Sequence, residues 1–81
     1  MFSKVLIANR GEIALRIIRT ARKLNVSTLV IYSSFDSKSP FVQHADEAIL
    51  IESNKVSTPY LDIPLIIKTA IEKQVDAIHP G

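Results

Sequence analysis

The residues best suited to chemistry form a short polar turn, Asn9-Arg10-Gly11-Glu12, directly after an apolar run. The run Val5–Ala8 is too short for a buried helix and is bounded by turn residues, so it predicts a buried strand. Gly11 can adopt a backbone conformation that other residues avoid, or let another backbone segment come close. Glu12 suits the positive end of a helix dipole. Ligands of open parallel sheets bind beyond the carboxyl ends of the strands, which makes this turn the first candidate site.

Nucleotide binding is one chemistry that such a turn could support. The free N–H groups of a helix N-terminus could hold a phosphate beside Gly11. Asp36, beyond the second apolar run, stands roughly where an acid that binds a ribose would be. A dinucleotide fingerprint needs three glycines, however, and this turn has one. The local sequence alone therefore favours a turn without a nucleotide.

Histidines and acids elsewhere give fewer indications of chemistry. His79 and Gly81 follow the last apolar run at the same sheet edge; a hydrogen bond from His79 to its own turn is the preferred interpretation. The other histidine, His44, has no metal-ligand cluster around it. In an extended segment Asp46 and Glu47 would point to opposite sides. We expect one of them to anchor a loop by accepting backbone N–H bonds, rather than to serve in acid–base catalysis.

A basic ridge follows the turn. Arg16, Arg19 and Lys23 are spaced three, four and seven residues apart, so they project from one helix face. The i,i+4 spacing allows Glu12 to pair with Arg16, which stabilises a helix by only about a few tenths of a kcal/mol. The ridge is either a solvated face or, with Leu15 beside it, a surface that docks a second subunit or domain.

Apolar spacing predicts the elements that position these residues. One helix covers Glu12–Asn25, and a second begins at Pro59 or Asp62. The stripe of the first helix comprises Ile13, Ala14, Ile17, Ile18, Ala21 and Leu24; that of the second comprises Ile63, Ile66, Ile67, Ala70 and Ile71. Further strands are predicted at Ser27–Ser33, Ala48–Ile51 and Asp76–Ile78. The remaining segments are two polar loops, Ser34–Pro40 and Glu52–Pro59, and a single turn, Phe41–His44.

This β-α-β-β-α-β order predicts a three-layer α/β domain with a mostly parallel sheet. Right-handed crossovers place the first strand between the second and the fourth. The carboxyl-edge turns Asn9–Glu12 and His79–Gly81 then follow neighbouring strands and face the same crevice.

Length and composition set the outer limits. The chain has 81 residues, 47% hydrophobic and 22% charged, which indicates one globular domain. A formal charge of +2 does not by itself argue for nucleic acid, and the absence of cysteine excludes disulfides. No signal peptide or membrane-spanning run is recognisable. The chain ends right after a strand, so we expect it to be a fragment of a longer polypeptide.

Several strings of this sequence resemble a known family. Lys4–Ala14, followed by Arg16–Arg19, is similar to the opening of the biotin carboxylases. Ala45–Ala48, Tyr60–Pro64 and Ala77–Gly81 are similar to later landmarks of the same domain, in the same order and at similar spacing. Loops depart from the family pattern at Phe41, at Glu52–Lys55 and at Pro59, and Lys23 stands where the family often has an acidic residue.

The resemblance implies the Rossmann-like domain that precedes an ATP-grasp domain, with 1–81 lacking the ATP-grasp and C-terminal domains. Biotin carboxylases use ATP, Mg²⁺ and bicarbonate to carboxylate biotin on a carrier protein, within acetyl-CoA, propionyl-CoA, methylcrotonyl-CoA or pyruvate carboxylases. The resemblance also implies a carboxyltransferase partner and a homodimer to which Arg16 and Arg19 contribute. The family's ATP, magnesium and catalytic residues lie downstream, so no catalytic or metal residue and no bound cofactor is expected in this segment.

We therefore expect this segment to supply walls and orientation, with Asn9, Arg10, Gly11, Glu12, His79 and Gly81 as sheet-edge candidates and Arg16, Arg19 and Lys23 as dimer-interface candidates. The expected location is cytoplasmic, or mitochondrial if a transit peptide precedes Met1. Two other hypotheses remain: a free-standing Rossmann-like or flavodoxin-like module that binds a nucleotide or protein, and an interaction segment that dimerises through the basic ridge.

Overall fold

The computed structural model describes residues 3–51 and 63–80. Its four strands and two longer helices follow the expected β-α-β-β-α-β order, and the structure adds a 3-10 turn and a short helix between the second and third strands. The elements are β1 (Lys4–Ile7), α1 (Gly11–Lys23), β2 (Ser27–Tyr32), the 3-10 turn η1 (Ser34–Asp36), α2 (Pro40–His44), β3 (Glu47–Leu50), α3 (Ile63–Glu72) and β4 (Ala77–His79). The predicted loop Glu52–Pro59 and the predicted helix start at Pro59 or Asp62 lie outside the described residues.

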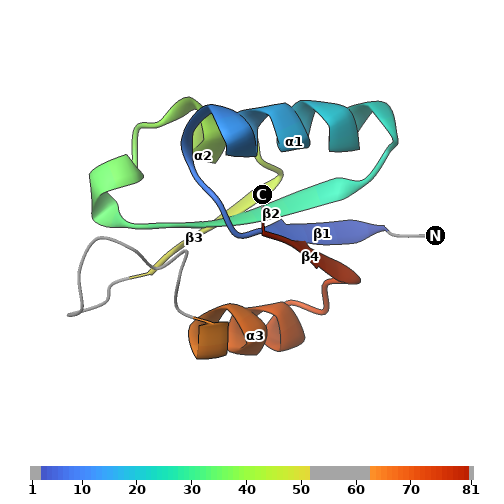
Figure 1. Cartoon of the computed structure of the whole chain (residues 1–81), viewed down its shortest axis with the longest axis vertical. Helices are drawn as coiled ribbons and strands as arrows, with labels where there is room; N and C mark the ends of the chain where they lie inside the picture. Colours follow the sequence, from blue (N-terminus) through green and yellow to red (C-terminus); the bar gives the residue numbers. More distant parts are fainter. Residues whose placement is uncertain (1–2, 52–62, 81) are drawn as a thin grey trace.

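The four strands form one parallel sheet in the order β3-β2-β1-β4. β1 lies between β2 and β4, as predicted from right-handed crossovers. Figure 1 shows the three layers, with α1 and α2 on one face of the sheet and α3 on the other. The prediction of a three-layer α/β domain is confirmed.

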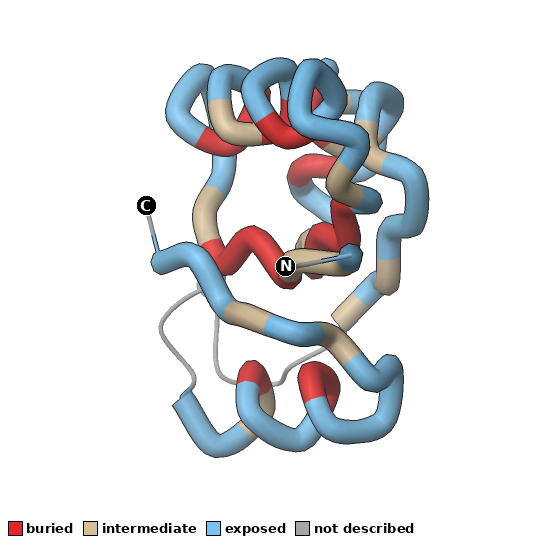
Figure 2. Tube along the Cα trace, turned by 90° about the vertical axis from the view of Figure 1, so that its right-hand side faces the viewer, coloured by how far each residue is buried: buried red, intermediate tan, exposed pale blue. Residues whose placement is uncertain are grey.

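The core consists of two apolar layers, one on each face of the sheet. Alternate residues of β1 point to opposite faces, so Leu6 joins Ile66 and Ala70 of α3 while Ile7 joins Ile18 and Phe41 under α1 and α2. In Figure 2 the buried stretches run through the central strands and the inward sides of the helices. Burial on both faces explains why β1 and β2 are continuous apolar runs.

The buried side of α1 differs from the predicted stripe. Leu15, expected beside the basic ridge, is buried, whereas Ile13 is 51% exposed. Leu15 lies in the same core cluster as Phe41 of α2. The segment predicted as a single turn is thus a short helix that packs against α1 and buries Leu15. Leu24 is exposed because the helix ends at Lys23 and the chain turns at Asn25, which has a φ of 59°.

The buried side of α3 is also narrower than predicted. Ile66 and Ala70 are buried as expected, and Thr69 is buried with them, its hydroxyl donating to the Leu65 carbonyl at 2.9 Å. The other members of the predicted stripe, Ile63, Ile67 and Ile71, are exposed. Residues three and four apart face a sheet together, so one row of α3 meets β1 and β2 and the neighbouring row does not.

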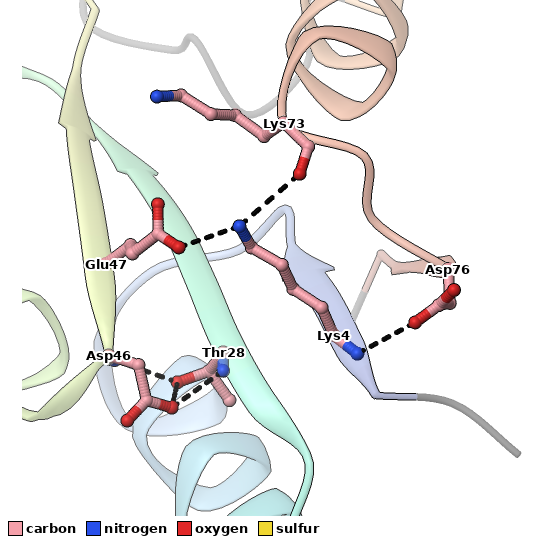
Figure 3. Close-up of polar contacts among 6 residues, drawn as sticks. All are labelled: Lys4, Thr28, Asp46, Glu47, Lys73 and Asp76. Atoms are coloured by element: carbon pink, nitrogen blue, oxygen red, sulfur yellow. Dashed lines mark hydrogen bonds and ion pairs between the residues drawn. The ribbon is translucent and has the colours of Figure 1, made fainter.

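Polar contacts lock the amino edge of the sheet (Figure 3). Asp76, just before β4, accepts hydrogen bonds from the Ser3 N–H and hydroxyl, both at 2.8 Å, and from the Lys4 N–H at 2.9 Å. The Lys4 Nζ lies 2.7 Å from Glu47 Oε1 and donates to the Lys73 carbonyl at 3.3 Å. The hydrogen bond from Lys4 lowers the pKa of Glu47, and the hydrogen bonds from Ser3 lower the pKa of Asp76. This edge joins β1, β3, β4 and the end of α3.

The adjacent acids Asp46 and Glu47 have different partners. Asp46 Oδ2 accepts from the Thr28 N–H at 2.8 Å and from its hydroxyl at 3.1 Å, while Glu47 faces Lys4 (Figure 3). The expectation that one acid anchors the chain by accepting a backbone N–H is confirmed for Asp46, which fixes the entry into β3 against β2.

Candidate functional site

The candidate site is the carboxyl edge of the sheet, where three turns follow neighbouring strands. The turn after β1 holds Asn9 and Arg10, η1 follows β2, and Pro80 follows β4. All strands are parallel, so these turns leave the sheet at the same edge. Gly81, one of the predicted edge residues, lies outside the described residues.

Asn9 links the turns after β1 and β4. Its Oδ1 accepts from the Arg10 N–H at 2.7 Å, and its Nδ2 donates to the Pro80 carbonyl at 3.1 Å. One residue earlier, the Ala8 N–H donates to the His79 carbonyl at 2.9 Å. These bonds hold the turns after β1 and β4 side by side at one edge of the sheet.

Arg10 links the turn after β1 to η1. Its Nε donates to Asp36 Oδ2 at 2.8 Å, and its Nη2 donates to Asp36 Oδ1, so the contact is bidentate. The Asp36 side chain is 3% exposed and that of Arg10 is 50% exposed. The Asp36 carboxylate is thus buried and held by Arg10, which agrees with the preference for a turn without a nucleotide over a ribose-binding acid at this position.

The two residues that begin α1 serve different purposes. Gly11 has a φ of +67°, and a Cβ placed on it would meet no atom within 4 Å. Of the two predicted uses of this glycine, the structure therefore selects the backbone conformation over a close approach. Glu12 is exposed in the first turn of α1 and lies 4.0 Å from Arg19. The prediction of a pair with Arg16 is wrong. The Glu12 side chain instead reaches Arg19, which lies seven residues, or two turns, further along α1.

The two histidines lie at different places, His44 at the end of α2 and His79 at the end of β4. His44 Nδ1 lies 2.9 Å from the Pro40 carbonyl within α2, and the His44 carbonyl accepts from Arg22 of α1. His79 is exposed at the end of β4. Within residues 3–51 and 63–80, no three His, Cys, Asp or Glu side chains gather as metal ligands would.

The basic ridge lies on the outer side of α1, where Arg16, Arg19 and Lys23 are all exposed. Beside it, an apolar groove of about 610 Å³ runs between α1 and β4. Its lining includes Ile13, Ile17 and Leu24 from the helix side and Ile78 from the strand. A charged ridge next to open apolar surface is suited to contact with another protein surface rather than to chemistry.

These contacts join the three turns at the carboxyl edge of the sheet. Comparison with known proteins gives it a family. The protein-family model described as "Biotin carboxylase, N-terminal domain" matches residues 1–81. The chain belongs to the biotin carboxylase N-terminal domain family.

Named relatives match the whole chain. A biotin carboxylase of Halalkalibacterium halodurans is 58% identical over 81 residues, and biotin carboxylase 2 of Bacillus subtilis is 56% identical; this chain spans 18% of each. The biotin carboxylase domain of a thermophilic 2-oxoglutarate carboxylase superposes with a TM-score of 0.92 at 47% identity, covering 100% of this chain and 18% of that one. These matches do not support the alternative of a free-standing nucleotide- or protein-binding module.

As a biotin carboxylase N-terminal domain, the chain has one site feature that sequence reasoning missed, the bidentate Arg10–Asp36 pair. In the sequence these two residues lie apart, Arg10 in the turn after the first strand and Asp36 beyond the second. The signal that joins them is topological: β1 and β2 are adjacent and parallel, so a residue just past the end of each can meet its counterpart.

No helix among residues 3–51 and 63–80 is both long enough and apolar enough to cross a lipid bilayer.

Proposed function

We propose that this chain is the N-terminal part of a biotin carboxylase, which uses ATP and bicarbonate to carboxylate biotin on a carrier protein. The observation that carries the proposal is the family match along all 81 residues, joined by a TM-score of 0.92 to a biotin carboxylase domain. Another structure of that kind, from Hydrogenobacter thermophilus, is described as a dimer in complex with MgADP and bicarbonate.

The segment serves the biotin step, which is common to enzymes with different final acceptors. Relatives named pyruvate carboxylase from Bacillus subtilis and propionyl-CoA carboxylase alpha chain from Ruegeria pomeroyi are 53% and 46% identical to it. Similar identity across different acceptors fits a role before the acceptor is engaged. The acceptor then belongs to a carboxyltransferase subunit or domain.

The residues of the carboxyl edge do not fit a nucleotide or magnesium site of their own. Asp36 is held by Arg10, and Asn9 is held by the Arg10 N–H and the Pro80 carbonyl. We therefore assign the binding of ATP, Mg²⁺ and carrier-bound biotin to the complete enzyme. The carboxyl edge of this segment forms one wall of the active site. A rigid wall against which a second domain closes keeps water from a hydrolysable intermediate.

The decisive experiment uses the full-length protein that carries this segment. ATP hydrolysis and the incorporation of labelled bicarbonate into biotin are measured with each substrate omitted in turn. We expect hydrolysis to require both bicarbonate and biotin. ATP hydrolysis that is indifferent to biotin, or no carboxybiotin at all, would contradict the proposed function.

The wall has its own test in the same assay. Replacing Asn9 and Arg10 together by alanine removes the bonds to Pro80 and Asp36, so turnover is expected to fall. If that variant had wild-type turnover and wild-type folding, the proposed role of the carboxyl edge as an active-site wall would be wrong.

The proposal includes partners and a location. Arg16, Arg19 and Lys23 contribute to a homodimer contact, supported by their exposure on one face of α1 and by the dimer described for the relative. A carrier protein brings the biotin. We propose a cytoplasmic location; a propionyl-CoA carboxylase of Homo sapiens, 41% identical, is named mitochondrial, and cell fractionation distinguishes the two compartments.

A further inference from the structure

We propose that Asp36 is a positioning residue for biotin carboxylation, acting through Arg10 to hold the carboxyl-edge wall in its working geometry. The inference rests on the proposed function and extends it to a residue outside the Asn9–Glu12 turn. It assigns to η1, which follows β2, a share in the site formed by the turns after β1 and β4.

The contact between Arg10 and Asp36 has the geometry of a fixed joint. Two N–H groups of one guanidinium meet the two oxygens of one carboxylate, which sets the plane and direction of the arginine as well as its distance. Ser39 Oγ donates to the same carboxylate at 3.4 Å. The Asp36 carboxylate is buried and the Arg10 side chain is half exposed. The buried carboxylate therefore anchors Arg10, whose exposed part lies at the carboxyl edge.

The joint is one link of a longer chain of contacts. Asp36 holds Arg10; the Arg10 N–H donates to Asn9; and Asn9 donates to the Pro80 carbonyl. Three turns that follow three strands are thereby connected side to side. A shift of η1 would be passed to the turn at the start of α1 and from there to the turn after β4.

Strand pairing does not require this chain of contacts. At the opposite edge, Asp76 and Lys4 already tie β1 to β4, and Lys4 reaches Glu47 of β3. An apolar contact could hold η1 at similar or lower free-energy cost, since burying a carboxylate carries a desolvation penalty. A bidentate ion pair supplies fixed direction, which matters for a wall that orients reactants.

The test is a kinetic double-mutant cycle in the full-length protein, with Asp36→Asn, Arg10→Gln and the double variant. The readout is ATP hydrolysis dependent on bicarbonate and biotin. We expect kcat to fall about tenfold or more in each single variant, because small misplacements of reactants are costly. The KM for ATP should stay unchanged, and the double variant should be no slower than the slower single one.

Asp76→Asn is the matched control. It makes the same chemical change in an aspartate that accepts several hydrogen bonds at the amino edge. If Asp36 had only a structural role, both variants would lose activity in proportion to their loss in melting temperature. We expect Asp36→Asn to lose kcat well beyond that relation and Asp76→Asn to follow it.

Other outcomes separate the inference from the function. A wild-type protein without biotin-dependent hydrolysis would overturn both. An active wild type with unchanged Asp36→Asn kinetics, or with additive losses in the double variant, would overturn the positioning role alone. If Asp36→Asn does not fold, Arg10→Lys keeps the charge and loses the bidentate geometry; reduced kcat supports the inference, and wild-type kcat overturns it.

Discussion

Gly11 is the residue at which backbone conformation matters most. It begins α1 with a φ of +67°, and the space beside it is open. A side chain at this position would therefore cost free energy through its backbone conformation and not through a clash with neighbouring atoms.

Replacing Gly11 by alanine should destabilise the fold by roughly 1–2 kcal/mol, the cost of a left-handed conformation for a residue with a Cβ. Asparagine tolerates this conformation better, so Gly11→Asn should recover part of the loss. Urea unfolding of the two variants gives the comparison. Equal stability of Gly11→Ala and the wild type would show that the positive φ is not needed.

Asp76 gives the fold a dependence on acid pH. Its pKa lies below the ordinary 3.8 chiefly because of the Ser3 hydroxyl, with the Ser3 and Lys4 N–H groups adding to the effect. The folded state then binds fewer protons than the unfolded state, so the stabilisation is present above pH 3.8 and is lost as pH falls through the lowered pKa.

Replacing Asp76 by asparagine should therefore flatten the loss of stability on acidification below about pH 4. Urea unfolding at a series of pH values, on wild type and variant, measures the two slopes. Lys68→Ala, an exposed change on α3, should keep the wild-type slope. Parallel curves for wild type and Asp76→Asn would contradict the assignment.

At the scale of the element, α3 is the helix whose apolar residues divide most clearly. Ile66 is 7% exposed and packs in the layer under β1 and β2, whereas Ile71 is 72% exposed. The same residue type thus occurs in two environments within two turns of one helix.

Truncating the buried one, Ile66→Ala, should cost roughly 2–4 kcal/mol because it leaves a cavity in the core. Ile71→Ala should change stability by less than about 0.5 kcal/mol. Chemical unfolding of the protein that carries this segment, followed for wild type and both variants, measures both values. Similar losses for the two variants would mean that α3 lies on the sheet in a different rotation.

At the scale of the whole molecule, α1 and α3 cover opposite faces of the sheet and have different surfaces (Figure 1). The outer side of α1 carries Arg16, Arg19 and Lys23 next to the apolar groove. On α3, Lys68 and Glu72 lie 4.0 Å apart and both are exposed. A subunit contact through the basic ridge should therefore be sensitive to charge on α1 and insensitive to charge on α3.

The double reversal Arg19→Glu and Lys23→Glu in the full-length protein should weaken self-association. Lys68→Glu, a reversal on the opposite face, should leave it unchanged. Sedimentation at several protein concentrations gives the dissociation constants, and added salt should reduce the difference between them. Unaltered association of the α1 variant would place the subunit contact elsewhere.

Much of the fold could be predicted because its signals are local. A strand, a polar turn with glycine and an amphipathic helix follow one another within the first 23 residues, and each is encoded by near neighbours. The position of β1 between β2 and β4 followed from the handedness of crossovers. That one acid of the Asp46–Glu47 pair anchors the chain followed from their place before a strand, and the structure identifies it as Asp46.

The residues that were predicted wrongly depend on what packs against them. Whether Leu15 or Ile13 of α1 is buried is decided by α2, because Phe41 occupies the same core cluster as Leu15. Spacing within α1 allows both rotations. Glu12 likewise meets Arg19 rather than Arg16, since exposed long side chains have several partners in reach.

By itself, the sequence determined the order of the elements, the parallel sheet and the edge at which Asn9, Arg10 and His79 lie, because periodicity and turn chemistry act over a few residues. Only the tertiary structure decided that Arg10 joins Asp36, 26 positions away, and that Asn9 joins Pro80, 71 positions away. Contacts at such separations depend on which strands are neighbours and on the rotation of each helix, and these are set by the packing of all the layers together.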